Sequence, residues 1–96
     1  MIVKRLLRPE RVRRTPPQFS WVDHRLVRDR HLERCGHEAL ALYLFLVIVA
    51  DAEGLSYYSE ASIARSLSMD AATVRSARAE LIEADLIAFR HPLYQV

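Results

Sequence analysis

The chain has 96 residues, a length typical of one domain, and a formal net charge of only +2 at pH 7. The small net charge hides an asymmetry. Residues 1–36 carry ten Lys and Arg against four acids, whereas residues 37–96 carry four Arg against eight acids. The single cysteine, Cys35, excludes an internal disulfide and suits a reducing cytoplasm. The longest apolar run, Ala39–Ala50, has twelve residues and is too short for a membrane span, which needs about 20.

The N-terminal end is basic and leads into a proline linker. We expect residues 1–18 to form this arm and linker, and residues 19–96 to form the folded domain. Pro16 and Pro17 favour an extended chain and prevent a helix from continuing. The arm suits contact with DNA phosphates or a minor groove, and a solvated tail that keeps the chain in solution fits equally well. Its basic residues are Lys4, Arg5, Arg8, Arg11, Arg13 and Arg14.

The first residues also bear on location and assembly. No run of about 7–15 apolar residues follows the first charges, so the sequence predicts no signal peptide and a cytoplasmic location. The arm also has apolar residues, through which it could dock on the body or on a second subunit. They are Ile2, Val3, Leu6 and Leu7.

Two aromatic residues and a helix are expected after the linker. Phe19 and Trp21 are predicted to anchor the chain by packing on the core, rather than by stacking on bases. Residues 24–35 are predicted to form a helix that ends at Gly36, a residue typical of helix C-termini. Cys35 is then expected to behave as a small buried hydrophobic residue.

The next segment, residues 37–51, is expected to form a helix that is apolar nearly all round. Such a helix is normally covered on every side. A winged domain of three helices and this size cannot readily cover it alone, so either the preceding helix or a second subunit must lie across it. We therefore predict a homodimer formed through the N-terminal helices.

Short strands are expected on both sides of the next two helices. Residues 51–54 are predicted to form a turn and residues 55–58 a short strand, with Tyr57 and Tyr58 alternating between core and solvent. Near the C-terminus, residues 88–90 and 93–96 are expected to pair as a hairpin. Its turn is His91-Pro92.

Residues 59–87 have the pattern of two helices joined by a tight turn. Ser59 and Asp70 are suited to cap the starts of the two helices, because their side-chain oxygens can accept free amides of the first turn. Apolar residues recur at helical spacing in the second helix, which therefore has one buried face. They are Val74, Ala77, Leu81 and Ala84.

This stretch resembles the helix-turn-helix of winged-helix DNA-binding proteins. The matching residues are Ile63-Ala64, Leu67, Thr73-Val74, Leu81 and Leu86-Ile87. The resemblance implies a mainly α (α+β) fold: a winged helix-turn-helix with an extra N-terminal helix and a short C-terminal β-hairpin wing. Ser68 and Asp85 stand where the family usually has glycine, and both positions are expected to adopt a positive φ.

The resemblance makes residues 71–84 the candidate recognition helix. Its outward positions at 100° per residue include Arg75, which can donate to guanine O6 and N7 from two of its guanidinium nitrogens and is the best base-contacting candidate. Arg65 is expected to contact a phosphate, and Arg90 and His91 to contact the DNA from the wing. An ordinary solvated helix face is the alternative. The predicted DNA-binding residues are Arg65, Ala72, Thr73, Arg75, Ser76, Arg78, Arg90 and His91.

Metal, cofactor and catalytic sites are not indicated. His31 and Cys35 have an i, i+4 spacing, but structural zinc sites normally use ligand pairs from two separated elements. The chain has only Gly36 and Gly54, so it lacks a glycine-rich phosphate loop, and no nucleophile elbow or two-metal acidic cluster is visible. We expect no enzyme activity, no metal and no cofactor.

The leading hypothesis is sequence-specific binding of duplex DNA. The protein would act as a small transcriptional regulator or as the DNA-recognition component of a replication or transposition system. The alternative is a winged helix that binds a protein partner within a larger complex, which the acidic balance of residues 37–96 favours. A third alternative is a module that binds single-stranded nucleic acid or RNA, which few features of the sequence support.

Overall fold

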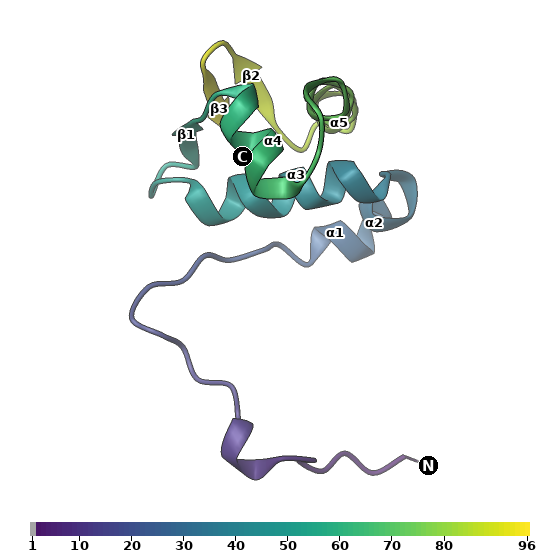
Figure 1. Cartoon of the computed structure of the whole chain (residues 1–96). Coiled ribbons are helices and arrows are strands. Elements are labelled where there is room, and N and C mark those ends of the chain that lie inside the picture. Colours follow the sequence, from purple (N-terminus) through teal and green to yellow (C-terminus); the bar gives the residue numbers. More distant parts are fainter. Residues whose placement is uncertain (1) are drawn as a thin grey trace.

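The structure is organised around one apolar helix, α3 (His37–Val49), with the helix-turn-helix on one side of it and two short helices on the other (Figure 1). A computed structural model describes residues 2–96. The remaining helical elements of these residues are η1 (Pro9–Arg11), α1 (Arg25–Arg28), α2 (His31–Arg34), α4 (Glu60–Leu67) and α5 (Ala71–Glu83). The strands β1 (Leu55–Tyr57), β2 (Ala88–Arg90) and β3 (Leu93–Gln95) form one antiparallel sheet in the order β1-β3-β2. This is the predicted winged helix-turn-helix.

Both predicted caps of the helix-turn-helix are present. The Ser59 hydroxyl accepts a hydrogen bond from the Ser62 amide at 3.1 Å, and the Asp70 carboxylate accepts one from the Thr73 amide at 2.7 Å. Each cap satisfies an amide that the helix itself leaves free, which makes the start of the helix more stable. The two caps therefore set where α4 and α5 begin.

The ends of the same two helices use left-handed residues in place of glycine. Ser68 follows α4 with φ 55°, and Asp85 lies two residues beyond α5 with φ 59°. In this conformation the amides of the next residues can turn back, so the Met69 amide donates to the Ala64 carbonyl and the Leu86 amide to the Leu81 carbonyl. The predicted positive φ at both positions is confirmed.

The sheet is short and closes the body at the C-terminus. β2 and β3 are joined by His91-Pro92, as predicted, and β1 pairs with the other side of β3. Gly54, just before β1, has φ 85°, and a Cβ there would lie 2.8 Å from the Val96 carbonyl oxygen. The Val96 amide donates to the Gly54 carbonyl at 2.9 Å, so glycine allows the chain end to lie against this turn.

The core lies between α3, α4, α5 and the sheet. Leu42 and Leu46 of α3 are one turn apart and completely buried, and they meet the inner face of α5 predicted from its periodicity. Tyr94 of β3 fills the side nearest the sheet. The buried cluster is Cys35, Ala39, Leu42, Leu46, Ile63, Val74, Ala77, Leu81, Ile87 and Tyr94. The prediction that Cys35 is a small buried hydrophobic residue is confirmed.

The predicted single helix over residues 24–35 is wrong, because α1 and α2 are separated by Arg30 in the left-handed conformation, φ 64°. Leu26 and Cys35 are the buried residues of this segment. They are nine residues apart, so a straight helix with 100° per residue would place them on opposite sides. The break at Arg30 allows both side chains to be buried.

Gly36 begins a helix and does not end one, which corrects a second prediction. It is extended, with φ −70° and ψ 164°, and it precedes α3 as its N-cap. Its amide donates to the Glu80 carboxylate of α5, 44 positions along the chain. A partner so distant in sequence leaves no local pattern, so neighbouring residues do not show that Gly36 precedes α3.

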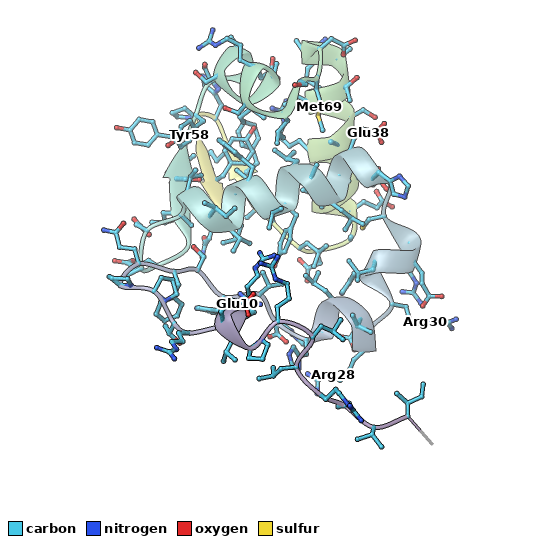
Figure 2. All side chains as sticks on the ribbon, turned by 60° about the horizontal axis from the view of Figure 1, so that its bottom comes forward. Glu10, Arg28, Arg30, Glu38, Tyr58 and Met69 are labelled. Carbon is cyan, nitrogen blue, oxygen red and sulfur yellow. The ribbon has the colours of Figure 1, made fainter. Side chains whose placement is uncertain are left out.

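The predictions for four aromatic residues fail because the core is filled from elsewhere. Phe19 is 66% and Trp21 75% exposed, since α4 and α5 already cover the buried side of α3. Tyr57 and Tyr58 are both exposed. β1 ends at Tyr57, so the alternation of a strand does not extend to Tyr58. The Tyr58 ring lies at the side of the body (Figure 2), with its centroid 5.3 Å from that of the Phe45 ring.

α3 keeps one exposed apolar stripe despite its neighbours. Leu44 and Ile48 are each more than half exposed. Together with Phe19 and Val22 they line a shallow groove of about 510 Å³. Within residues 2–96, no helix is long and apolar enough to cross a membrane.

Candidate nucleic-acid interface

The outer face of α5 carries most of the predicted DNA-contacting residues. Val74, Ala77 and Leu81 point into the core, so the positions between them face solvent. Thr73 is half-buried at the flank, and its amide is the one capped by Asp70. The exposed residues of the first two turns are small apart from one arginine. They are Ala71, Ala72, Arg75 and Ser76, and Ala79 is exposed just beyond them.

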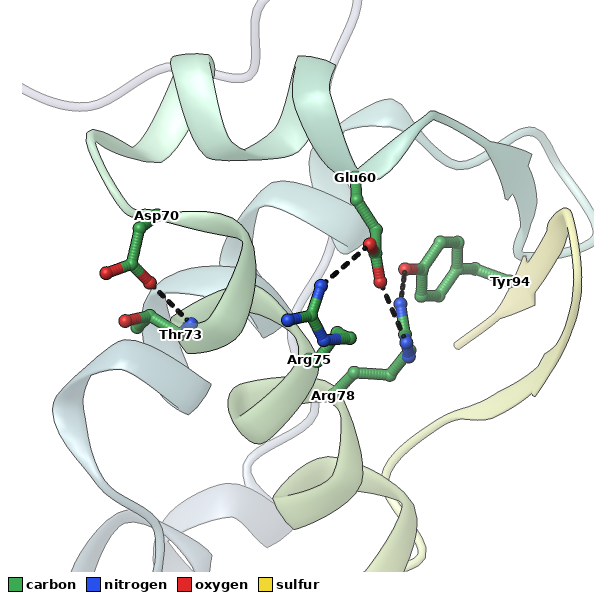
Figure 3. A network of polar contacts seen from close by, with 6 residues as sticks. All are labelled: Glu60, Asp70, Thr73, Arg75, Arg78 and Tyr94. Carbon is green, nitrogen blue, oxygen red and sulfur yellow. Dashed lines mark hydrogen bonds and ion pairs between the residues drawn. The ribbon is translucent and has the colours of Figure 1, made fainter.

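Arg75 is the largest exposed side chain on this part of α5. Its side chain is 54% exposed, and one guanidinium nitrogen, Nη1, lies 3.3 Å from Oε1 of Glu60 at the start of α4 (Figure 3). An exposed ion pair of this kind contributes little to folding, on the order of 0.2–1 kcal/mol. Arg75 is therefore available to a partner, with one contact restraining it.

Arg78, one turn further on, has a different environment. Its side chain is only 15% exposed. Nη2 lies 3.0 Å from Oε2 of Glu60, and Nη1 donates to the Tyr94 hydroxyl at 3.2 Å. The guanidinium also lies over the Phe89 ring, 4.4 Å from its centroid. These contacts join α5 to α4 and to both strands of the wing, so Arg78 connects its own helix to three other elements.

Glu60 is a residue of this site that the sequence pattern did not reveal. Hydrogen bonding from Arg78, with a further contribution from Arg75, holds the pKa of Glu60 below the ordinary value of 4.5. The carboxylate is therefore ionised at neutral pH. Its only signal in the sequence is an acid in the first turn of a helix, which is common and does not identify arginine partners 15 and 18 residues away.

The other predicted contacts lie around α5. Arg65 is exposed on α4, with Nη2 3.4 Å from the Ser62 hydroxyl. Arg90 and His91 are exposed at the end of β2 and in the wing turn. The predicted residues of the body thus come from α4, α5 and the wing, which adjoin one another in Figure 1. The fold brings these residues together although they lie far apart in the sequence.

Acids lie among these arginines. Asp70 caps α5, and hydrogen bonds from Thr73 hold its pKa below the ordinary value of 3.8, so it is charged at neutral pH. Glu60 adds a second negative charge beside Arg75. The body is therefore not a strongly basic surface, and most of the positive charge of the chain lies elsewhere.

That charge lies in the arm. All residues from 2 to 22 are exposed, and η1 carries a local ion pair between Arg8 and Glu10 at 2.8 Å. The arm lies on the side of α1 and α2, away from α4 and α5 (Figure 1). An extended chain of these 21 residues reaches about 70 Å at roughly 3.3 Å per residue. The largest dimension of the molecule is 47 Å, so the arm can reach either face.

The histidine and cysteine of α2 do not form a metal site in this structure. Cys35 is 7% exposed, and burial, followed by the nearby Glu80 charge, raises the pKa of its thiol. Both effects disfavour the thiolate that a metal needs. Within residues 2–96, no three His, Cys, Asp or Glu side chains are grouped closely enough to hold a metal ion.

Comparison with known proteins identifies a family for this chain. A family model described as a helix-turn-helix domain matches residues 34–87, more than half of the chain. No curated protein and no solved structure matches the chain. The match begins at the end of α2 and covers α3, β1, α4 and α5. Helix-turn-helix domains are typically DNA-binding and not enzymes. The chain belongs to this helix-turn-helix domain family.

Proposed function

We propose that the protein binds duplex DNA sequence-specifically through α5, as a small transcriptional regulator or as the DNA-recognition component of a replication or transposition system. The observation that carries this proposal is the outer face of α5, where a half-exposed Arg75 stands among small side chains. Ala72, Ser76 and Ala79 would allow the helix to approach the base edges closely. Arg75 would then reach a guanine in the major groove.

The remaining predicted residues would fix the position of α5 on the duplex. Arg65 and Arg90 are exposed on the flanking elements, where they would contact phosphates, and His91 would do so from the wing turn. Thr73 and Ser76 would bond a phosphate or a base edge. Arg78 would act mainly through the shape of the site, because it is largely buried and paired.

The arm would supply most of the affinity that does not depend on sequence. Its basic residues, from Lys4 to Arg14, are exposed, and residues 37–96 cannot replace them because they carry eight acids against four arginines. Each phosphate neutralised by a basic residue releases counterions, which favours binding at low salt. The length of the arm allows it to follow the backbone beyond the site covered by α5.

A homodimer would place two recognition helices on one DNA. The exposed stripe of Leu44 and Ile48 on α3, with Phe19 beside it, is the apolar surface available for a second copy. Two helices about 34 Å apart would suit an inverted repeat. Light scattering at high micromolar concentration should give a dimer, and Leu44→Glu should give a monomer with an intact core. A monomeric parent protein would contradict this part of the proposal.

The central experiment compares Arg75→Ala with a matched loss of charge. A site is first selected from randomised duplexes. Arg75→Ala should then lose roughly 5–150-fold in preference for the selected site, because a paired contact to guanine gives about 1–3 kcal/mol of discrimination. Arg28→Ala removes the same charge from α1, on the far side of α3 (Figure 2), and should leave the preference unchanged.

Two outcomes would contradict specific binding by α5. Selection could enrich no sequence, or Arg75→Ala and Arg28→Ala could weaken all duplexes equally. If the intact protein binds no duplex at about 100 mM salt, the alternative is a protein-interaction module. The acidic balance of residues 37–96 and the apolar groove on α3 support that alternative.

A further inference from the structure

Glu60 bridges the two arginines of the recognition helix. Its Oε1 lies 3.3 Å from Nη1 of Arg75, and its Oε2 lies 3.0 Å from Nη2 of Arg78 (Figure 3). Both arginines come from α5, whereas Glu60 is the first residue of α4. The carboxylate is therefore positioned by one helix of the motif and acts on the other.

The two ends of this bridge are not equivalent. Arg78 is held by three contacts at once: Glu60, the Tyr94 hydroxyl and the Phe89 ring. Arg75 is mostly in solvent, and Glu60 is the acidic partner it contacts. Arg78 consequently fixes the carboxylate, and the carboxylate then restricts the directions in which Arg75 can point. A long arginine side chain otherwise has many rotamers, and ordering it on binding costs free energy.

The same carboxylate works against non-specific attraction to DNA. It is charged at neutral pH, because its arginine partners hold its pKa down. It also adds a negative charge close to the face of α5 that would meet the duplex. Phosphates are the same on every sequence, so this repulsion lowers affinity for all duplexes alike. A pre-oriented arginine, in contrast, helps only where a suitable base is present.

We infer that Glu60 is a specificity-determining positioning residue, which orients Arg75 for base contact and weakens binding to unselected duplexes. This inference depends on the proposed function. Stability accounts for the Arg78 end of the bridge but not for the Arg75 end, because an ion pair with the exposed Arg75 would add little to folding. The specificity ratio, the affinity for the selected site divided by that for random duplex, is therefore the quantity that Glu60 should change.

The test compares Glu60→Gln with Glu83→Gln, which removes an equal charge from an exposed position at the end of the same recognition helix. Both variants should bind random duplex more tightly than the parent does. Only Glu60→Gln should lower the specificity ratio, by about threefold to fivefold, which corresponds to one exposed ion pair. Glu60→Asp separates charge from geometry: its shorter side chain cannot span both arginines, so the ratio should fall without a gain in random-sequence affinity.

A double variant tests whether the change in the specificity ratio depends on Arg75. In an Arg75→Ala background, Glu60→Gln should leave the specificity ratio unchanged, because the side chain that it orients is gone. Thermal unfolding of each variant checks that the fold persists. An unchanged ratio in Glu60→Gln, or an equal fall in the Arg75→Ala background, would overturn the inference while the proposed function stands. A parent protein that selects no sequence would overturn both.

Discussion

DNA binding needs two properties, and the arm and the body each supply one of them. Residues 2–18 hold six basic residues against one acid, and none of their side chains is buried. Residues 19–96 hold eight basic residues against eleven acids, but they contain a closed core and polar contacts that hold individual side chains. Charge and geometry are thus carried by separate regions. A substitution should therefore affect either charge-dependent affinity or shape, according to the region in which it falls.

Deleting residues 1–14 should give the largest effect on binding. The shortened chain lacks six Lys and Arg, and the slope of log affinity against log salt should become shallower by about 0.9 for each phosphate that is no longer neutralised. If all six bind phosphates, the fall in affinity between about 50 and 200 mM salt should be roughly a thousandfold smaller for the shortened chain. Fluorescence anisotropy on random duplex measures this change. An unaltered salt dependence would mean that the arm is only a solvated tail.

A leucine-to-alanine substitution should lower stability much more in the body than in the arm. Leu46 is 0% and Leu7 93% exposed. Leu46→Ala should lower the free energy of unfolding by about 2–5 kcal/mol, because it leaves a cavity between α3 and α5. Leu7→Ala should stay within about 0.5 kcal/mol of the parent. Urea denaturation provides the comparison. A large loss for Leu7→Ala would show that the arm docks on the body or on a second subunit.

Within the body, removing either of the two arginines of α5 should change the free energy of unfolding by different amounts. Arg78→Ala should cost about 1–2 kcal/mol of unfolding free energy, because it removes charged hydrogen bonds and the contact with the Phe89 ring. Arg75→Ala should change stability by less than about 0.5 kcal/mol. Arg78→Lys keeps the charge but not the planar fork, and should fall between Arg78→Ala and the parent. Equal stability of the two alanine variants would contradict the structural role of Arg78.

The smallest expected effect is the pH dependence of one cap. The folded state lowers the pKa of Asp70 from 3.8, so its contribution to stability is complete above that value and is lost as the pH falls through the lower folded pKa. Asp70→Ala should therefore be less stable than the parent at neutral pH, with the difference closing in acid. Ser59→Ala removes a cap that does not titrate, so its deficit should remain in acid. Thermal melts from about pH 2 to about pH 7 would test this; a deficit of Asp70→Ala that persists in acid would exclude the carboxylate as the cause.

Features that depend on near neighbours could be predicted from the sequence alone. Caps at Ser59 and Asp70 and left-handed residues at Ser68 and Asp85 involve atoms a few positions apart, so residue type and spacing are sufficient to predict them. The buried face of α5 follows from helical periodicity in the same way. The wing was predictable because its turn residues lie between two short strands. These local features specified the winged helix-turn-helix.

Which of the candidate side chains are exposed depends on the packing of distant elements. Arg75 and Arg78 look alike in sequence, yet contacts with Glu60, Tyr94 and Phe89 leave one exposed and hold the other. The break at Arg30, the bond from Gly36 to Glu80 and the exposure of Trp21 are likewise results of packing. Each depends on groups brought together from distant positions, and on a core volume that other side chains had already filled. The local sequence therefore does not show which side chains occupy the core.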